Sequence, residues 1–143
     1  MSKLLIASDH AGFVLKKKLL SYFDKKRISV QDLGTYSKER CDYPVYAYAL
    51  AKKISSGEAK QGILICKSGI GNSIVANRLS GVRAALCYNL KAAKLSREHN
   101  DSNVLVLGSA FVTADLAKKM ITVWLKTKFL GGRHLRRLKL IDK

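Results

Sequence analysis

The sequence predicts an α/β fold, a Rossmann-like three-layer α/β/α sandwich around a five-stranded parallel sheet. Short apolar runs alternate with longer segments of helical periodicity along all 143 residues, as strands and helices do in a parallel sheet. The run Gly62–Cys66 (GILIC) is apolar without alternation, which is typical of a strand buried on both faces. No repeat, low-complexity tract or linker interrupts the pattern, so residues 1–143 are interpreted as one domain.

The predicted elements follow one another in regular order. Strands are expected at residues 3–8, 28–33, 62–66, 82–87 and 103–107, and helices at about 11–22, 45–56, 70–79, 90–97, 113–128 and 133–141. The apolar face of the first helix carries Ala11, Leu15, Leu19 and Tyr22. The run Lys16–Lys18 is therefore expected to project from the other faces. Such a sheet, whether Rossmann-like or flavodoxin-like, binds ligands beyond the carboxyl ends of its strands.

Net charge, the length of apolar runs and the spacing of cysteines limit the classes of protein to which the chain can belong. The chain has 27 Lys and Arg against 10 Asp and Glu, a formal net charge of +17, and a pI near 10.0. Such a charge attracts anions, and a solvated lysine-rich surface is the alternative. No apolar run is long enough for a membrane span, and the N-terminus turns polar too early for a signal peptide. The three cysteines are widely spaced without a CxxC pair, so a cytoplasmic protein with reduced thiols is expected.

Chemically useful side chains follow several of the predicted strands. Asp9 and His10 come after the first strand, and Cys66 ends the third strand before the turn Lys67–Asn72. The stretch His99–Asp101 lies between the fourth helix and the fifth strand. We expect these residues to meet where the fold gathers its active-site loops.

The turn after Cys66 could stabilise negative charge. Gly69 and Gly71 stand at a strand-to-helix junction, where backbone amides can face an anion or a developing oxyanion. The turn has neither the GK[ST] ending of a Walker loop nor the GxGxxG pattern, and an ordinary tight turn is the alternative. Cys66 is either an inert core residue or a base that abstracts a carbon-bound proton. In the second case the helix N-terminus is expected to lower the pKa of its thiol.

Histidine and arginine supply the other candidates. His99, paired with Asp9 across the edge of the sheet, could shuttle a hydroxyl proton near neutral pH, and a structural role is the alternative. No HxxxH motif or carboxylate cluster suggests a metal site. Arg133 and Arg137 are four residues apart and share one helical face, whereas Arg136 points elsewhere. Their guanidinium groups could bind phosphate, unless this basic stretch is only solvated.

Five segments together carry a resemblance to a known family. In order along the chain they are SDHAG, GTYSKERCDYP, GILICKSGIG, LSREHNDSNVLVLG and GGRHLRR. In this combination, over essentially the whole chain, the sequence resembles the type B ribose-5-phosphate isomerases and the related galactose-6-phosphate isomerase subunits. The resemblance implies a homodimer with shared active sites, and leaves open whether dimers pair into tetramers. It also implies the reversible conversion of ribose 5-phosphate to ribulose 5-phosphate through a cis-enediolate, a pentose phosphate pathway step without cofactor or metal.

The resemblance further implies a role for each matching position. Cys66 would be the base that moves the proton between C2 and C1, and Asp9 and His99 would assist opening of the furanose ring. The hydroxyl of Ser68 would move protons between O1 and O2, and the amides around Gly69 and Gly71 would stabilise the enediolate. The implied sugar contacts are Tyr43 and Asn100, and the implied phosphate ligands are His10, Arg133 and Arg137, with both arginines reaching into the neighbouring subunit's site.

Four positions depart from the family pattern. Lys67 stands where glycine is usual, Ser68 where threonine is common, Asn72 where an apolar residue is usual, and Ala110 where relatives often carry a phosphate-binding arginine. Lys67 adds positive charge that could lower the pKa of the neighbouring thiol. These departures leave two alternatives, an isomerase of a six-carbon sugar phosphate (allose 6-phosphate or galactose 6-phosphate) and a non-catalytic sugar-phosphate sensor.

Two observations weigh on these alternatives. In galactose-6-phosphate isomerases the functional groups are divided between two different chains, whereas Cys66 and His99 occur together here, which favours a self-sufficient homodimer. From another class, a basic nucleic-acid-binding protein would need aromatic side chains on a basic face. Phe13, Phe23 and Trp124 fit core or near-core positions better, so binding of nucleic acid is not expected.

Overall fold

The computed structural model describes residues 4–142, and the predicted order of strands and helices is confirmed within them. The strands are β1 Leu4–Ser8, β2 Val30–Asp32, β3 Gln61–Cys66, β4 Ala84–Leu86 and β5 Val104–Gly108. The helices are α1 Phe13–Lys25, α2 Tyr43–Ser55, α3 Ile70–Ala76, α4 Leu90–Asn100, α5 Ala114–Lys126 and α6 Arg133–Ile141, with a 3₁₀ turn at His10–Gly12. Lys3, which the prediction placed in the first strand, lies outside the described residues.

The five strands form one parallel sheet in the order β2-β1-β3-β5-β4. The predicted parallel sheet is therefore confirmed. From β1, the chain first adds β2 on one side. It then crosses to the other side of β1, where β3 pairs with β1 and where β5 and β4 follow. The switch in direction therefore lies between β1 and β3. Ligands in such sheets bind beyond the carboxyl ends of the strands at this switch point.

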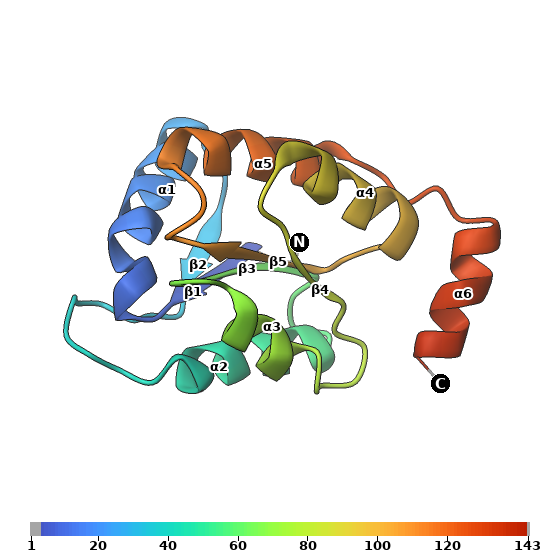
Figure 1. The fold of residues 1–143 in the computed structure, drawn as a ribbon, viewed down its shortest axis with the longest axis horizontal. Helices are drawn as coiled ribbons and strands as arrows, with labels where there is room; N and C mark the ends of the chain where they lie inside the picture. The colour runs from blue at the N-terminus through green and yellow to red at the C-terminus, as the bar shows by residue number, and fades with distance from the viewer. Residues whose placement is uncertain (1–3, 143) are drawn as a thin grey trace.

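Helices cover both faces of the sheet, as Figure 1 shows, with α1, α4 and α5 on one side and α2 and α3 on the other. Each face of the sheet has its own hydrophobic core, and successive residues of β3 alternate between the two. Ile63 and Ile65 pack on the α1 and α5 side, and Leu64 packs on the α2 side. Because both faces are buried, these strands need no polar alternation. Phe23 and Trp124 are fully buried in the first of these cores, as the sequence indicated.

Lys16 corrects the prediction for the first helix. Its side chain is completely buried, whereas Lys17 and Lys18 are exposed as expected. The ammonium group lies 2.6 Å from Oδ1 of Asp32, at the end of β2, and also donates to the backbone carbonyl of Thr35. A buried charge requires such partners, so this lysine ties the start of α1 to the loop that follows β2.

Helix α6 stands apart from the two layers, beside the β4 edge of the sheet (Figure 1). Gly131 and Gly132 precede it with φ values of 70° and 60°, a region that favours glycine and separates α6 from the preceding segment. Among the nine residues of α6, only His134 and Leu138 are buried. The helix therefore contacts the rest of the chain along a narrow stripe and leaves most of its surface exposed.

Candidate active site

The carboxyl ends of β1, β3 and β5 are joined by backbone hydrogen bonds. The amide of Asp9 donates to the carbonyl of Ile65 at 3.2 Å, which ties the end of β1 to β3. The amide of Ser109 donates to the carbonyl of Cys66 at 2.9 Å, which ties the segment after β5 to the same strand. The segments that follow these strands are thus fixed relative to one another before any ligand binds.

Cys66 lies beneath the N-terminus of α3. Its side chain is only 5% exposed, and the amide of Gly69 donates to its Sγ at 3.2 Å. Gly69 has φ 84°, and a Cβ there would lie 2.5 Å from a side-chain carbon of Leu86. Glycine is therefore required at this position for both backbone conformation and space. The turn holds backbone amides against the thiol, which is the geometry of an anion-stabilising site.

The surroundings of Cys66 act on its pKa in opposite directions. Burial is the largest effect and raises the pKa of the thiol, and the nearby Asp9 carboxylate raises it further. The backbone amides of Asn72, Gly69 and Ser68 lower the pKa but do not outweigh burial. The predicted lowering of the Cys66 pKa is therefore wrong for this chain. Lys67 is exposed and is not among the groups that shift this pKa.

Asp9 caps the 3₁₀ turn after β1, and His10 is the first residue of that turn. Asp9 is 6% exposed, and its Oδ1 accepts a hydrogen bond of 3.1 Å from the amide of Gly12. His10 accepts a hydrogen bond of 3.2 Å at Nδ1 from the amide of Cys41. Neutral His10 therefore carries its proton on Nε2, which leaves that atom as the donor for a ligand.

Tyr43 and Ser68 complete this group of residues. The Tyr43 ring packs on Gly71, because a Cβ at position 71 would lie 2.4 Å from ring carbons of the tyrosine. The Ser68 hydroxyl accepts a hydrogen bond of 3.1 Å from the amide of Ile70. The structure thus places seven of the predicted site residues at or beside the carboxyl edge, which we call the Cys66 cluster: Asp9, His10, Tyr43, Cys66, Ser68, Gly69 and Gly71.

The other four predicted residues lie elsewhere in the chain. His99 and Asn100 form the end of α4, which extends three residues further than predicted. Helix α4 leads back to the start of β5, so its last turn lies at the amino edge of the sheet (Figure 1). Asp9 follows the carboxyl end of β1, and a five-residue strand such as β1 or β5 spans about 16 Å between the two edges. The expected pairing of His99 with Asp9 within one chain is therefore wrong.

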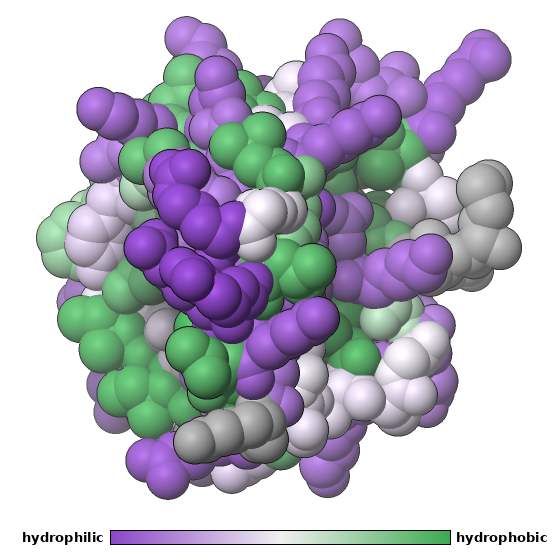
Figure 2. Space-filling model, turned by 90° about the vertical axis from the view of Figure 1, so that its right-hand side faces the viewer, coloured by the Kyte–Doolittle hydropathy of each residue, from purple (hydrophilic) through white to green (hydrophobic). Residues whose placement is uncertain are grey.

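His99 instead faces α6. Its ring stacks on the ring of His134, with centroids 4.3 Å apart and an interplanar angle of 12°. Arg133 and Arg137, on the same helix, are both exposed. Figure 2 looks onto the side of the molecule that carries α6, where strongly hydrophilic side chains lie beside apolar ones. We call His99, Asn100, Arg133, His134 and Arg137 the α4–α6 cluster.

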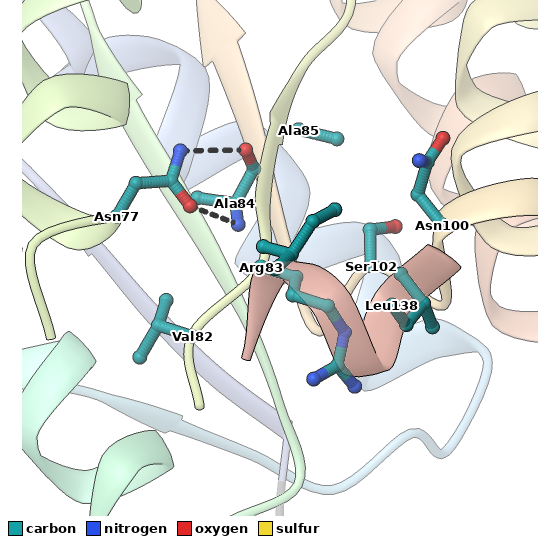
Figure 3. Close-up of a pocket in the computed structure, with 9 residues that line it drawn as sticks. Asn77, Val82, Arg83, Ala84, Ala85, Asn100, Ser102 and Leu138 are labelled. Atoms are coloured by element: carbon teal, nitrogen blue, oxygen red, sulfur yellow. Dashed lines mark hydrogen bonds between the residues drawn. The ribbon is translucent and has the colours of Figure 1, made fainter. Parts of the chain in front are cut away.

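A pocket of about 410 Å³ adjoins this second cluster, between β4, α4 and α6 (Figure 3). Asn100, Ser102 and Leu138 line one part of it. Arg83 donates to Asp142 Oδ2 at 2.9 Å and lies 3.3 Å from Asp101 Oδ2, and so ties the end of α6 to the segment after α4. Cys66 does not line this pocket.

Sequence reasoning did not single out His134 or Arg83. His134 stands between the two predicted phosphate-binding arginines, so its place in the GGRHLRR segment was an available signal. Arg83 gave no local signal, because its partners Asp101 and Asp142 are distant in the sequence. Within residues 4–142 no group of three His, Cys, Asp or Glu could hold a metal ion. No helix of this described part is long and apolar enough to cross a membrane.

Comparisons with known proteins agree with this architecture. The family model described as Ribose/Galactose Isomerase matches residues 4–141. Ribose-5-phosphate isomerase B of Escherichia coli is 44% identical over 141 residues, which cover 99% of this chain and 95% of that protein. A solved ribose 5-phosphate isomerase of Thermotoga maritima has a TM-score of 0.95 and 50% identity, and covers 99% of this chain and 97% of its own.

A third relative was solved with a ligand. Ribose-5-phosphate isomerase B from Mycoplasma genitalium, with bound ribulose 5-phosphate, has a TM-score of 0.93 and 42% identity. The match covers 98% of this chain and 93% of that chain. Family model, sequence relatives and solved structures therefore agree over nearly the whole length, and the chain belongs to the ribose/galactose isomerase family.

Proposed function

We propose that this protein interconverts ribose 5-phosphate and ribulose 5-phosphate. The observation that carries the proposal is the buried Cys66 thiol beneath backbone amides of the turn that starts α3. A base beside an oxyanion site is what proton transfer next to a carbonyl requires. The ribulose 5-phosphate bound to the Mycoplasma genitalium relative supports the choice of substrate.

The reaction begins with the open-chain aldose. Cys66 reacts as the thiolate, formed by loss of its proton to solvent, although burial raises the pKa of the thiol in the single chain. The thiolate takes the proton from C2, the electron pair of that C–H bond forms the C1–C2 double bond of a cis-enediolate, and the carbonyl electron pair moves to O1. The negative charge on oxygen is stabilised by the amides around Gly69 and Gly71. The thiol then returns the proton to C1, while the Ser68 hydroxyl moves a proton from O2 to O1. C2 is oxidised as C1 is reduced, so the conversion consumes no oxidant or reductant.

We further infer that the working site combines two subunits. In one chain the Cys66 cluster and the α4–α6 cluster lie at opposite edges of the sheet. A two-fold dimer can bring the first cluster of one subunit to the second cluster of the other, and every site is then completed in the same way. The exposed apolar residues Ile70 and Ile74 of α3 and Leu135 and Leu140 of α6 are candidates for the surface that such a dimer buries.

In this arrangement the partner contributes the groups that the Cys66 cluster lacks. Asp9 and the partner subunit's His99 assist opening of the furanose ring, and the partner subunit's Asn100 contacts the sugar. Phosphate is bound by His10 and by two exposed guanidinium groups, those of the partner subunit's Arg133 and the partner subunit's Arg137. We place the protein in the cytoplasm, because Cys41, Cys66 and Cys87 are free thiols and the base must stay reduced.

Mixed dimers test the shared site. Cys66→Ala and His99→Gln subunits are purified separately, then unfolded and refolded together. If each site takes Cys66 from one subunit and His99 from the other, every mixed dimer has one intact site. Statistical mixing should therefore restore about a quarter of wild-type turnover. If both residues acted within one chain, no subunit in the mixture would be intact, and turnover would stay at the level of the separate variants.

Substrate choice is tested with purified wild-type protein on ribose 5-phosphate, allose 6-phosphate and galactose 6-phosphate. The proposal expects the highest kcat/KM with ribose 5-phosphate. A higher kcat/KM with either six-carbon substrate would contradict it. Binding of all three without turnover by a folded protein would indicate a sugar-phosphate sensor.

A further inference from the structure

The stacked pair His99 and His134 is an arrangement that the proposed chemistry does not yet use. The rings are nearly parallel, at 12°, and their centroids are 4.3 Å apart. His134 is 7% exposed, although most of α6 around it is exposed. One of the two buried positions of this helix is thus occupied by an imidazole that covers the imidazole of His99.

We propose that His134 is a positioning residue that holds the ring of His99 in the orientation needed for opening the furanose. This inference rests on the proposed function, because it takes His99 as the group that moves the hydroxyl proton during ring opening. His134 itself acts through His99 and contacts no reacting atom.

The physical reason lies in the freedom of a histidine ring. The torsion that turns an imidazole about its Cβ–Cγ bond has broad minima, so hydrogen-bonding geometry at the ring nitrogens is poorly fixed without a neighbour. A flat ring stacked on one face limits that rotation and leaves the ring nitrogens at the edge accessible. Proton transfer depends steeply on such placement, and a misplacement of about 1 Å can cost about 100-fold in rate.

The supporting ring is also suited to stay uncharged. Burial lowers the pKa of His134, and the nearby charges of His99, Arg133 and Arg137 lower it further, while Glu98 opposes them. A neutral ring can stack on His99 in either protonation state without charge repulsion. The supporting contact therefore persists while His99 gains and loses its proton.

Two contacts other than the histidine stack also hold α6 against the rest of the chain. Leu138 lies one helical turn after His134 and is 5% exposed, beside the pocket of Figure 3. Arg83 binds Asp142 at the other end of the helix. Loosening α6 as a whole can therefore be separated from removing the ring, because Leu138 and His134 are distinct contacts.

Ring opening can be measured apart from proton transfer. Ribose 5-phosphate closes its ring through O4, whereas ribulose 5-phosphate carries phosphate on the oxygen that would close a furanose and stays open. Turnover of ribose 5-phosphate therefore needs both steps. Exchange of the C1 proton of ribulose 5-phosphate with deuterium from solvent needs only abstraction and return of that proton by Cys66.

The experiment compares His134→Ala, His134→Phe and Leu138→Ala as dimers of confirmed size. His134→Ala should lower kcat with ribose 5-phosphate about tenfold or more, and should leave deuterium exchange into ribulose 5-phosphate within about twofold of wild type. His134→Phe keeps a flat ring and should recover most of the lost turnover. Leu138→Ala controls for general loosening of α6 and should not reproduce the selective loss.

A double variant asks whether His134 acts through His99. In a His99→Gln background, removal of the His134 ring should cause no further loss of ribose 5-phosphate turnover, because the group it positions is already gone. Additive losses, equal loss of turnover and exchange, or wild-type turnover in His134→Ala would each overturn this inference alone. Absence of turnover in the wild-type protein would instead overturn the proposed function, and the inference with it.

Discussion

The Cys66 cluster is held by its own chain, whereas the α4–α6 cluster is supported along one face only. Around Cys66, three strand ends are joined by backbone hydrogen bonds, and the thiol is nearly fully buried. Helix α6 buries His134 and Leu138 and exposes both of its proposed phosphate-binding arginines. The first cluster is therefore held in place by contacts within the chain, whereas the second is open on the faces of α6 that we propose a partner subunit covers.

This difference assigns different tasks to the two clusters. Proton abstraction needs groups fixed to within a fraction of an ångström, and rigid, buried segments provide that precision. Long, flexible arginine side chains suit phosphate, which is recognised by charge and hydrogen bonding at some distance from the reacting carbons. Removal of the base or distortion of the turn around it should therefore act on kcat, and removal of an exposed arginine of α6 should act on KM.

The largest effect is expected from Cys66→Ala. Loss of the base should lower kcat with ribose 5-phosphate by about 10³-fold or more, because general-base catalysis contributes roughly 10²–10⁴-fold and no other thiol replaces it. The fold should persist, since alanine fits a position that is already buried. Turnover and circular dichroism are measured beside Cys87→Ala as the matched control. Turnover of Cys66→Ala within tenfold of wild type would show that another group is the base.

Gly108→Ala tests whether rigidity of the Cys66 cluster matters for kcat. A Cβ at position 108 would lie 2.4 Å from the backbone carbonyl oxygen of Ser68. Backbone cannot yield as a side chain can, so the turn over Cys66 must shift. We expect kcat to fall about 10- to 100-fold, with a loss of about 1–3 kcal/mol in the free energy of unfolding.

The control for this variant is Gly81→Ala. Gly81 has open space around its Cβ position and a φ of 77°, so alanine there introduces backbone strain without contacting the turn. Gly81→Ala should lose stability and keep its kcat. If both variants kept wild-type kcat at equal stability, a rigid turn would not be needed for proton transfer.

Arg137→Ala tests the other cluster. A hydrogen bond to a charged group contributes roughly 1.5–3 kcal/mol, so we expect KM for ribose 5-phosphate to rise about tenfold or more, with little change in kcat. Arg136→Ala is the matched control, because both side chains are exposed arginines of α6. An unchanged KM in Arg137→Ala, or an equal rise in Arg136→Ala, would remove Arg137 from the phosphate site.

The same contrast explains what the sequence could predict. Strand β3, the turn and helix α3 follow from signals that are local in sequence, an unbroken apolar run followed by two glycines. Their order along the chain was therefore predicted correctly, although α3 ends at Ala76 and not near residue 79. The position of His99 was not, because it depends on where α4 ends and on which edge of the sheet its last turn reaches.

Two further errors have the same origin in tertiary contacts. Helical periodicity placed Lys16 outside the core, but its partner Asp32 is 16 residues away and permits burial of the charge. The helix N-terminus suggested a lowered pKa for Cys66, but desolvation by the surrounding fold outweighs the amides. A local sequence pattern indicates which backbone amides a turn places near a thiol. Whether those amides or burial decides the pKa depends on how the rest of the chain packs around the thiol.

The smallest effect on turnover is expected from Cys87→Ala, which sharpens the contrast between two buried thiols. Burial raises the pKa of Cys87 to about 11, and a hydrogen bond from Ser96 lowers it only in part. An unfolded thiol has a pKa of about 8.5, so at higher pH the unfolded chain ionises first. The stability that this thiol contributes is therefore complete below about pH 8.5 and is lost as pH rises toward 11.

At 1.36 kcal/mol per unit, the free energy of unfolding of wild type should fall by about 2–3 kcal/mol more than that of Cys87→Ala between pH 8.5 and 11. Denaturant unfolding at several pH values measures this difference, and turnover at pH 7 should be unchanged. Parallel stability curves for the two proteins would contradict the burial argument. A strong loss of turnover would show instead that Cys87, which lacks the glycine turn of Cys66, has a part in the proposed chemistry.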